Sequence, residues 1–192
     1  IFTSRDATLG QKALETLKTK SSNSTSTLTY HQLNVTDNKS VEDFVAWFQK
    51  SIGKLDILIN NAGIAYGTTD EERKNIVKTN YFSVIALTDK LLPFLSEDGK
   101  ILDISSNLGR LSFQGETLTK ILTDENLTRE KLDKAAEDIL EVIKDFKPFG
   151  PLVDGIYPAS KALLNAYIRK FLPSQLKSGQ QYYAVHPGWV KT

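Results

Sequence analysis

The sequence predicts an α/β fold in which a parallel β-sheet carries helices on both faces. Three observations support this fold class. Short apolar runs of strand length alternate along the chain with longer segments whose apolar residues recur every three or four positions. The run at 55–59 is broken only by Asp56, which is typical of a strand buried on both faces of a parallel sheet, and we expect another buried strand at 100–104. The length of 192 residues suits one α/β domain with a sizeable core.

The first part of the chain begins with what resembles the end of a strand. A loop rich in Ser, Thr and Asn separates the first expected helix from the second strand. Asp37 and the polar residues after it are typical of a helix N-terminus. In chain order, we expect a strand at 1–3, a helix at 6–18, a loop at 21–27, a strand at 28–33, a helix at 37–52 and a strand at 55–59.

The rest of the chain continues the alternation. A long helical stretch has Pro93 near its end, and the segment 116–147 carries charged, amphipathic helix patterns. In chain order, we expect a helix at 71–94, a strand at 100–104, helices within 116–147, a helix at 157–172 and a strand at 181–185. This order of elements is typical of a doubly wound sheet, which binds its ligands beyond the carboxyl ends of its strands.

Composition narrows the possible function classes. A hydrophobic content of 40% with 24% charged residues is ordinary for a soluble globular chain, and the formal net charge of +1 offers no basic face for nucleic acid. No apolar run approaches the length of about 18 residues that a membrane span needs. The absence of cysteine, with only two histidines, argues against a disulfide framework, a thiol nucleophile and a metal cluster. No secretory leader is recognisable, so we expect a cytoplasmic protein.

Tyr157 and Lys161 form the pair of residues most suggestive of chemistry. Residues four apart lie on one face of a helix, and among the seven tyrosines only Tyr157 has a lysine at that spacing. A nearby cation stabilises a phenolate, so the hydroxyl becomes a usable proton donor and acceptor. The same spacing also fits a solvated helix face with a buried ring, and the pair alone does not separate the two interpretations.

Polar residues at the expected strand ends favour a site. Because the carboxyl ends of parallel strands meet at one edge of the sheet, residues that follow different strands can converge there. The residues in this position are Arg5, Asn34, Asn61, Ser106 and the pair Pro187-Gly188.

Five segments then occur in a recognisable order: Asn60-Asn61-Ala62-Gly63, Asn80, Ser106 in Ile-Ser-Ser, Tyr157 with Lys161, and Pro187-Gly188. Together they resemble the short-chain dehydrogenase/reductase family, and the resemblance covers nearly the whole chain. Within the family the chain looks most similar to monomeric carbonyl reductases that use NADPH, and next to plant reductases of the salutaridine type. The long gap between Ser106 and Tyr157 and the C-terminal Pro-Gly-Trp-Val-Lys-Thr carry this finer resemblance.

The resemblance implies a reaction and a catalytic set. The reaction is reduction of a ketone, aldehyde or quinone carbonyl to an alcohol with NADP(H), in which Tyr157 donates the proton. Ser106 would hydrogen-bond the carbonyl oxygen, and Lys161 would assist the tyrosine and hold the nicotinamide ribose. Asn80 would position a water that leads protons to Lys161. The implied substrate contacts are Ser106, Tyr157 and Trp189, and no metal is implied.

The resemblance also implies a cofactor-binding set. Arg5 lies at the end of the second strand of the family, where an arginine accommodates the 2′-phosphate of NADP and an acidic residue would select NAD. Asn34 departs from the aspartate usual beside the adenine, although its carbonyl can still accept a hydrogen bond. The implied set is Ser4, Arg5, Asn34, Val35, Asn61, Ala62, Gly63, Tyr157, Lys161, Pro187, Gly188 and Val190.

The resemblance predicts a partial domain. Residues 1–192 would form one doubly wound Rossmann domain without the first strand and its Gly-rich phosphate loop and without the C-terminal strand, while 107–155 would be a helical insertion beside the active site. The missing first strand is central in the family's sheet, so we expect these residues alone not to form one continuous sheet. Without the phosphate loop we also expect them, taken alone, to bind NADPH poorly and to be inactive. The insertion implies a monomer. The alternative function is an inactive reductase-like subunit that serves a larger assembly as a structural or binding component.

Overall fold

The computed structural model describes residues 1–21, 25–146 and 153–188, and it has the expected Rossmann-type α/β fold. The strands form two parallel sheets, with the orders β1-β2 and β3-β4-β5. The chain accordingly divides into two compact units, Ile1–Gly53 and Lys54–Thr192. The expectation that these residues do not form one continuous sheet agrees with this topology, whereas the single domain 1–192 stays a prediction.

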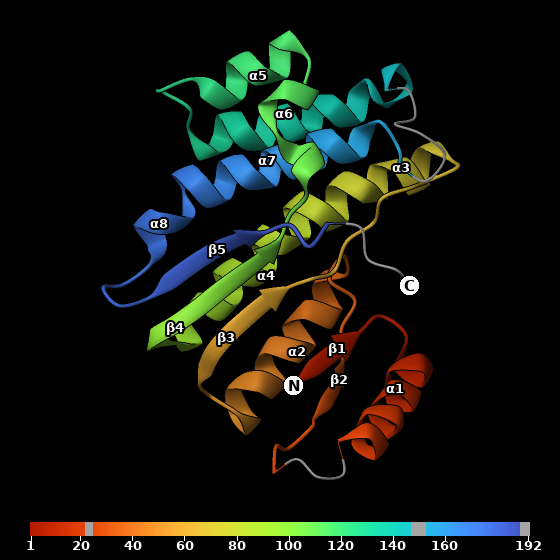
Figure 1. Ribbon diagram of the computed structural model, residues 1–192, viewed down its shortest axis with the longest axis vertical. Helices are drawn as coiled ribbons and strands as arrows, with labels where there is room; N and C mark the ends of the chain where they lie inside the picture. The colour runs from red at the N-terminus through yellow and green to blue at the C-terminus, as the bar shows by residue number, and fades with distance from the viewer. Residues whose placement is uncertain (22–24, 147–152, 189–192) are drawn as a thin grey trace. The chain divides into compact units, whose positions relative to one another are not determined.

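The first unit pairs β1 (Phe2–Ser4) with β2 (Tyr30–Gln32) and packs α1 (Ala7–Lys20) and α2 (Asn38–Ser51) against them (Figure 1). Both helices begin at an aspartate cap, because the Asp6 side chain accepts from the backbone N–H of Leu9 and the Asp37 side chain from that of Ser40. The ring of His31 packs against Trp47 at a centroid distance of 4.4 Å, which makes this histidine part of the packing.

The second unit is built on β3 (Leu55–Asn60), β4 (Leu95–Ile104) and β5 (Gln181–Val185), all parallel. β5 has the predicted bounds. β4 begins earlier than predicted, at Leu95, because Leu95 pairs with Leu55 before the register shifts to Ile57 and Lys100. The polar residues 96–99 within this early part gave no strand signal in the sequence.

The prediction that 55–59 is buried on both faces is wrong. Leu58 and Asn60 are buried, but Ile57 and Ile59 on the other face are 53% and 57% exposed. β3 lies at the edge of the three-stranded sheet, and helices cover the face that carries Leu58 and Ile101. The apolar run here predicts a strand, but it does not predict which face of that strand is buried.

The long helix expected at 71–94 is present in four consecutive pieces: α3 (Asp70–Val77), the π-helical turn η1 (Lys78–Phe82), α4 (Ser83–Leu91) and the 3₁₀ turn η2 (Leu92–Phe94). A capping box between Thr69 and Glu72 starts it. The helix expected at 157–172 is α7 (Ile156–Lys170), followed by the short α8 (Leu172–Gln175). α7 is mostly buried and packs against both α3 and η1.

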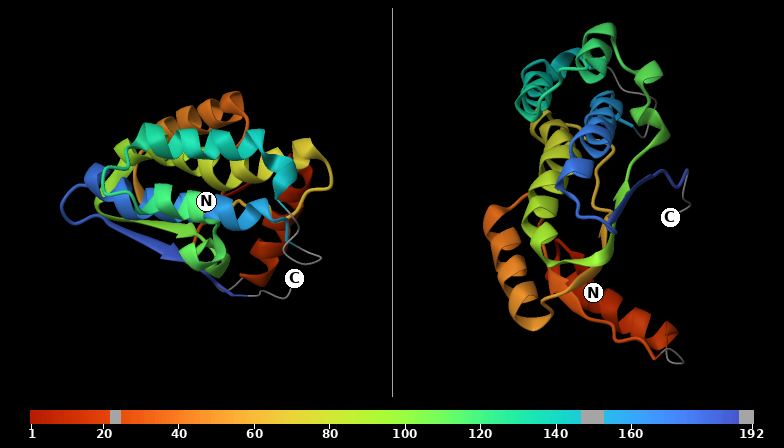
Figure 2. Two further views of the ribbon diagram at one scale, coloured as in Figure 1. Left: turned by 90° about the horizontal axis from the view of Figure 1, so that it is seen from above. Right: turned by 90° about the vertical axis from the view of Figure 1, so that its left-hand side faces the viewer.

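Residues 107–145, between β4 and α7, are largely helical, and the helices expected within 116–147 are present. This segment contains the 3₁₀ turns η3 (Asn107–Gly109), η4 (Leu111–Phe113) and η5 (Ile143–Asp145) and the helices α5 (Glu116–Thr123) and α6 (Arg129–Glu141). Figures 1 and 2 both show α5 and α6 lying beside α7. α6 buries Leu132 and Ile139, and Asp133 accepts a 2.7 Å hydrogen bond from the Tyr81 hydroxyl. The segment is thus packed on the core.

No membrane-crossing helix is found within 1–21, 25–146 and 153–188, since none there is both long and apolar enough.

Replacing Leu132 with alanine tests whether α6 belongs to the core. Leu132 is 0% exposed, so we expect the free energy of unfolding to fall by about 2–5 kcal/mol, from lost burial and the cavity left behind. Urea denaturation followed by circular dichroism measures the change. Val142→Ala, at a position 48% exposed just after the same helix, is the control and should cost far less. If the two variants lost equal free energy of unfolding, α6 would be a solvent-exposed helix that does not belong to the core.

Candidate active site

The N-terminal turn of α7 places Tyr157 and Lys161 on one face. The Lys161 Nζ atom lies 5.9 Å from the centroid of the Tyr157 ring. The same ammonium donates a 2.6 Å hydrogen bond to the carbonyl oxygen of Ile104, at the end of β4. Lys161 is only 4% exposed, so the solvated face that the spacing alone also allowed does not describe this pair.

Burial changes the acid–base behaviour of Lys161. Removal from water disfavours the ammonium and lowers the pKa of Lys161 to about 8, while the negative charge of Asp103 opposes this shift. At neutral pH most Lys161 side chains therefore remain charged. The site holds a buried cation close to a phenol.

Ser106 lies two residues beyond Ile104, at the carboxyl end of β4, as the sequence predicts. It is half-buried and caps the 3₁₀ turn η3, with its hydroxyl oxygen accepting a 3.2 Å hydrogen bond from the backbone N–H of Leu108. The hydroxyl hydrogen of Ser106 can still be donated to another group. The preceding Ser105 is buried and instead donates to the side chain of Asn165 on α7.

Asn80 lies within the π-helical turn η1 and is 0% exposed. Its amide accepts from the backbone N–H of Ile64 and donates to the Ile64 carbonyl, each at 2.8 Å. It also donates to the Ser160 hydroxyl at 3.0 Å. Asn80 thus ties the loop after β3 to α7. A direct contact from Asn80 to Lys161 is not found among these bonds, although the second lone pair of the amide oxygen stays available to a water.

The loop after β3 brings backbone close to the same groups. A methyl group built on Gly63 would lie 3.3 Å from the Asn80 Oδ1 atom and 3.7 Å from the Lys161 Nζ atom. A side chain at residue 63 would therefore crowd the approach to the ammonium. Asn61 and Ala62, which precede it, are exposed.

Some of these residues line a cavity of about 570 Å³ in the second unit. Its lining includes Asn61, Gly63, Ser106, Tyr157, Lys161 and Gly188. Pro187 lines it as well, and Gly188 has a φ of +74°, a conformation that favours glycine. Asn107 also lines the cavity, and its buried Oδ1 atom has no hydrogen-bond partner among the residues described.

The cavity fits the nicotinamide half of a dinucleotide in its chemistry. A ribose needs hydrogen-bonding groups and close backbone approach, which Lys161, Tyr157 and the glycine at 63 provide. Trp189 and Val190, also expected at this site, lie outside the described residues.

The remaining expected cofactor residues lie in the first unit. Arg5 follows β1 with an exposed side chain, and Ser4 hydrogen-bonds the carbonyl of Asp6 at 2.7 Å. Asn34 follows β2, half-buried like Val35, and its side-chain oxygen accepts from the backbone and hydroxyl of Thr36. Both lone pairs of that oxygen are thereby used, so accepting from an adenine amino group requires one of these bonds to be released.

A buried ion pair missed by the sequence analysis holds the start of α7. Arg73 on α3 donates to both carboxylate oxygens of Asp154, at 2.7 and 3.2 Å. The same carboxylate accepts from the backbone N–H of Ile156 at 2.9 Å, and the Asp154 carbonyl accepts from that of Tyr157. The Asp154 N–H in turn donates to the carbonyl of Ala65. The two partners are 81 residues apart, and no local pattern links them.

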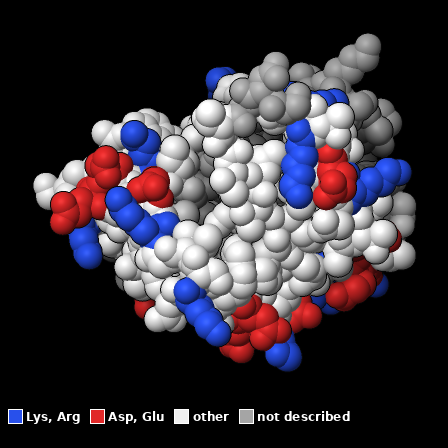
Figure 3. All heavy atoms as spheres, turned by 90° about the horizontal axis from the view of Figure 1, so that it is seen from below, with Lys and Arg blue, Asp and Glu red and all other residues white. Residues whose placement is uncertain are grey.

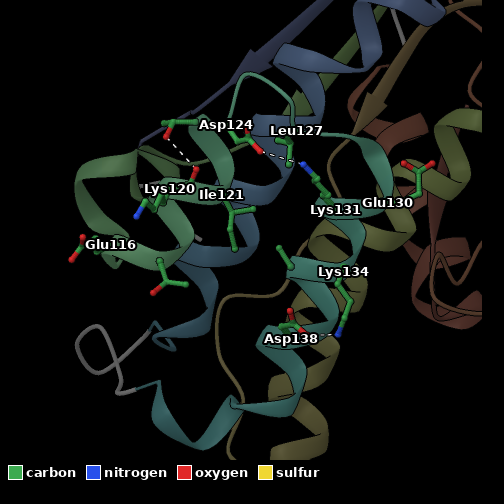
Figure 4. A pocket seen from close by; sticks show the side chains of 12 residues that line it. Glu116, Lys120, Ile121, Asp124, Leu127, Glu130, Lys131, Lys134 and Asp138 are labelled. Atoms are coloured by element: carbon green, nitrogen blue, oxygen red, sulfur yellow. Dashed lines mark hydrogen bonds and ion pairs between the residues drawn. The ribbon is translucent and has the colours of Figure 1, made fainter.

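A larger hollow of about 1140 Å³ lies between α5 and α6 (Figure 4). Its charged walls pair with each other, because Lys131 contacts Asp124 and Lys134 contacts Asp138, as the dashed lines show. The hollow therefore offers mostly satisfied charges, whereas the smaller cavity offers a phenol, an ammonium and a free hydroxyl hydrogen. We assign the candidate active site to the smaller cavity.

Comparisons with known proteins show which family this chain resembles. The sequence model of the family described as short chain dehydrogenase matches residues 1–118. The (+)-neomenthol dehydrogenase of Arabidopsis thaliana is 32% identical over 223 residues, which cover 100% of this chain and 74% of the relative. The human protein named carbonyl reductase [NADPH] 1 is 28% identical over 204 residues, with 100% of this chain and 72% of the relative covered.

Among solved structures, the salutaridine reductase of Papaver somniferum is similar to this chain with a TM-score of 0.85 and 29% identity. The match covers 98% of this chain and 77% of the reductase. Both kinds of enzyme indicated by the sequence, carbonyl reductases and plant reductases, are thus among the proteins that this chain resembles.

Removing the Asp154 carboxylate tests how much the buried pair contributes. Asp154→Ala leaves the Arg73 guanidinium uncompensated, with a side chain only 13% exposed, so we expect unfolding to become easier by about 3–5 kcal/mol. Urea denaturation of both proteins gives the difference. Asp138→Ala, which breaks the exposed pair with Lys134 on α6, serves as the control and should change stability little. A similar small change in Asp154→Ala would show that the buried pair does not anchor α7.

Proposed function

Because the chain belongs to the short-chain dehydrogenase/reductase family and is therefore an oxidoreductase, we propose that it reduces a carbonyl to an alcohol with NADPH. The substrate would be a ketone, an aldehyde or a quinone. The observation that carries the proposal is the buried Lys161 ammonium beside the Tyr157 ring, in the cavity that Ser106 also lines.

The proposed mechanism assigns one task to each of the catalytic side chains. Bound NADPH supplies the hydride. The Tyr157 hydroxyl donates its proton to the carbonyl oxygen, so that the product is a neutral alcohol and the phenolate remains on the protein. The Ser106 hydroxyl donates a hydrogen bond to the same oxygen and stabilises the charge that develops there. The Lys161 ammonium stabilises the phenolate until a proton returns.

Asn80 would act on this reaction in two ways. Its three hydrogen bonds hold the loop after β3 against α7, which fixes the distance between Gly63 and Lys161. In addition, we propose that a water accepted by its remaining lone pair leads protons from solvent toward Lys161. Asn80 is then a positioning residue for the loop and part of the path that restores the tyrosine proton.

NADP(H) is the proposed cofactor because of Arg5. An arginine after this strand offers its guanidinium to the 2′-phosphate, which a carboxylate would repel. Ser4, Asn34 and Val35 would complete the adenosine site, while residues 61–63, Tyr157, Lys161, Pro187, Gly188 and Val190 would hold the nicotinamide side. That a relative carries NADPH in its name supports this choice.

We further propose a small-molecule substrate and a monomer. Positive and negative side chains are interspersed over the face drawn in Figure 3, which favours neither nucleic acid nor another polyanion. α5 and α6 pack on α7, and the resemblance implies that such an insertion blocks the helix pair through which tetrameric relatives associate. A cytoplasmic location stays a prediction.

The Tyr157→Phe variant tests the proton donor. The ring and its packing remain, but no proton is available, so we expect NADPH oxidation to fall roughly 10²–10⁴-fold with NADPH binding retained. Loss of absorbance with a quinone or an aromatic ketone measures turnover in the full-length protein, and nicotinamide fluorescence measures binding. Tyr183→Phe, which removes the hydroxyl of a half-exposed tyrosine on β5, is the control. Equal activity of Tyr157→Phe and the unaltered protein would exclude this role.

The Arg5→Asp variant tests the cofactor assignment. Loss of the charged hydrogen bonds to the 2′-phosphate should weaken NADPH binding roughly ten- to hundredfold, while NADH binding is kept or improved. Fluorescence titration with the two cofactors measures the ratio. Lys12→Asp on α1 makes the same change of charge in the same unit and should leave the ratio near that of the unaltered protein. An unchanged NADPH affinity in Arg5→Asp would contradict the assignment.

A further inference from the structure

A second buried charge lies beneath the candidate site. Asp103 on β4 is 1% exposed. Its Oδ1 atom accepts a 2.8 Å hydrogen bond from the Asn60 amide, which also donates to the Thr88 hydroxyl at 3.0 Å. The other carboxylate oxygen, Oδ2, is buried and has no hydrogen-bond partner among the residues described. A carboxyl held in this way is costly unless a positive charge compensates it.

The Lys161 ammonium supplies a positive charge that stabilises the Asp103 carboxylate. This ammonium donates to the carbonyl oxygen of Ile104, the residue that follows Asp103 on the strand, so both charges are buried at the same end of β4. No ion pair within 4.0 Å includes Lys161 among the described residues, so the two groups interact through space rather than by a direct hydrogen bond.

The charges of Asp103 and Lys161 each reduce the effect of burial on the pKa of the other. Burial raises the pKa of Asp103 to about 6, and the Asn60 hydrogen bond and the Lys161 charge reduce that rise. Burial lowers the pKa of Lys161 to about 8, and the Asp103 charge reduces that fall. Between about pH 6 and 8 both side chains are charged, and each favours the charged form of the other.

Other titratable groups face this pair. Tyr157 and His186 line the same cavity as Lys161. On the core side, burial raises the pKa of the Tyr167 phenol above its ordinary value, and nearby carboxylates, Asp103 among them, add to this shift. Tyr167 therefore stays neutral between about pH 6 and 8. Because His186 lines the same cavity as Lys161, the experiment needs a control variant at this histidine.

We propose that Asp103 is a positioning residue for the proton-transfer step, whose buried carboxylate keeps the Lys161 side chain in its ammonium form beside Tyr157. This inference rests on the proposed function, because it gives Lys161 a partner in the reaction assigned above. Without the Asp103 charge, the uncompensated burial of Lys161 would convert the ammonium to a neutral amine at a lower pH, and the phenolate left by Tyr157 would lose its stabilising cation.

The pH profile of the Asp103→Asn variant tests this in the full-length protein. The amide keeps the acceptor for Asn60 but removes the charge, so we expect the basic limb of the profile for NADPH oxidation to move down by about one pH unit. The rate at pH 6, where Lys161 is protonated in either case, should change much less. Asp89→Asn on α4 removes another partly buried carboxylate that contacts Tyr167, and its basic limb should not move. A basic limb that stays in place in Asp103→Asn overturns the proposal.

A second measurement needs neither activity nor a variant at Asp103. The ¹³Cε resonance of Lys161 in the isotopically labelled, unaltered protein should titrate near pH 8, with a smaller inflection near pH 6 as Asp103 loses its proton. The inflection should persist in His186→Gln, which excludes the histidine as its source. Absence of the inflection, or its loss in His186→Gln, overturns the coupling. If both resonance features are present but no NADPH is oxidised, the proposed function fails and the coupling stands.

Discussion

The buried ion pair between Arg73 and Asp154 is the interaction on which the candidate site most depends. Burying two charges is unfavourable unless their remaining hydrogen-bonding capacity is used. Here it is used, because the carboxylate also accepts from the backbone N–H of Ile156, while the guanidinium also reaches the carbonyl of Phe146. The pair joins α3, the end of the helical segment before α7 and the start of α7 itself. Tyr157 follows directly, so its place is set by contacts outside the cavity.

A second set of buried polar contacts fixes Lys161. The carbonyl of Ile104 holds its ammonium from the sheet, and Asn80 holds the loop with Gly63 close to it. A lysine at this depth would normally lose its proton readily, and the Asp103 carboxylate limits that loss. Lys161 and the loop with Gly63 are therefore held by hydrogen bonds to other protein groups. The hydroxyls of Tyr157 and Ser106 remain available to donate to a ligand.

Local patterns predicted much of this arrangement. The alternation of apolar runs and helical periods gave the order of elements, and the spacing of Tyr157 and Lys161 placed both on one face of α7 because that relation spans a single turn. Ser106 was found because it lies just beyond an apolar run and matches the serine of the family that the sequence resembles. The pair Arg73–Asp154 and the contact of Asn60 with Asp103 were not, since partners 81 and 43 residues apart leave no mark on local periodicity. Exposure of Ile57 and Ile59 was also missed, because the covering of a strand depends on its place in the sheet.

The π-helical turn η1 has a consequence for how this chain can vary. Each residue of an α-helix advances the side-chain direction by about 100°, so one additional residue in a turn resets which faces the two flanking helices present. Arg73 on α3 is phased toward Asp154, while Thr88 on α4 is phased toward Asn60 under the sheet. If the turn lost one residue, the chain could keep the contact of Arg73 with Asp154 or that of Thr88 with Asn60, but not both. The π-helical turn thus sets the rotation of α4 relative to α3, on which both hydrogen bonds depend. The number of residues in 78–82 is therefore more constrained than the identity of most of them.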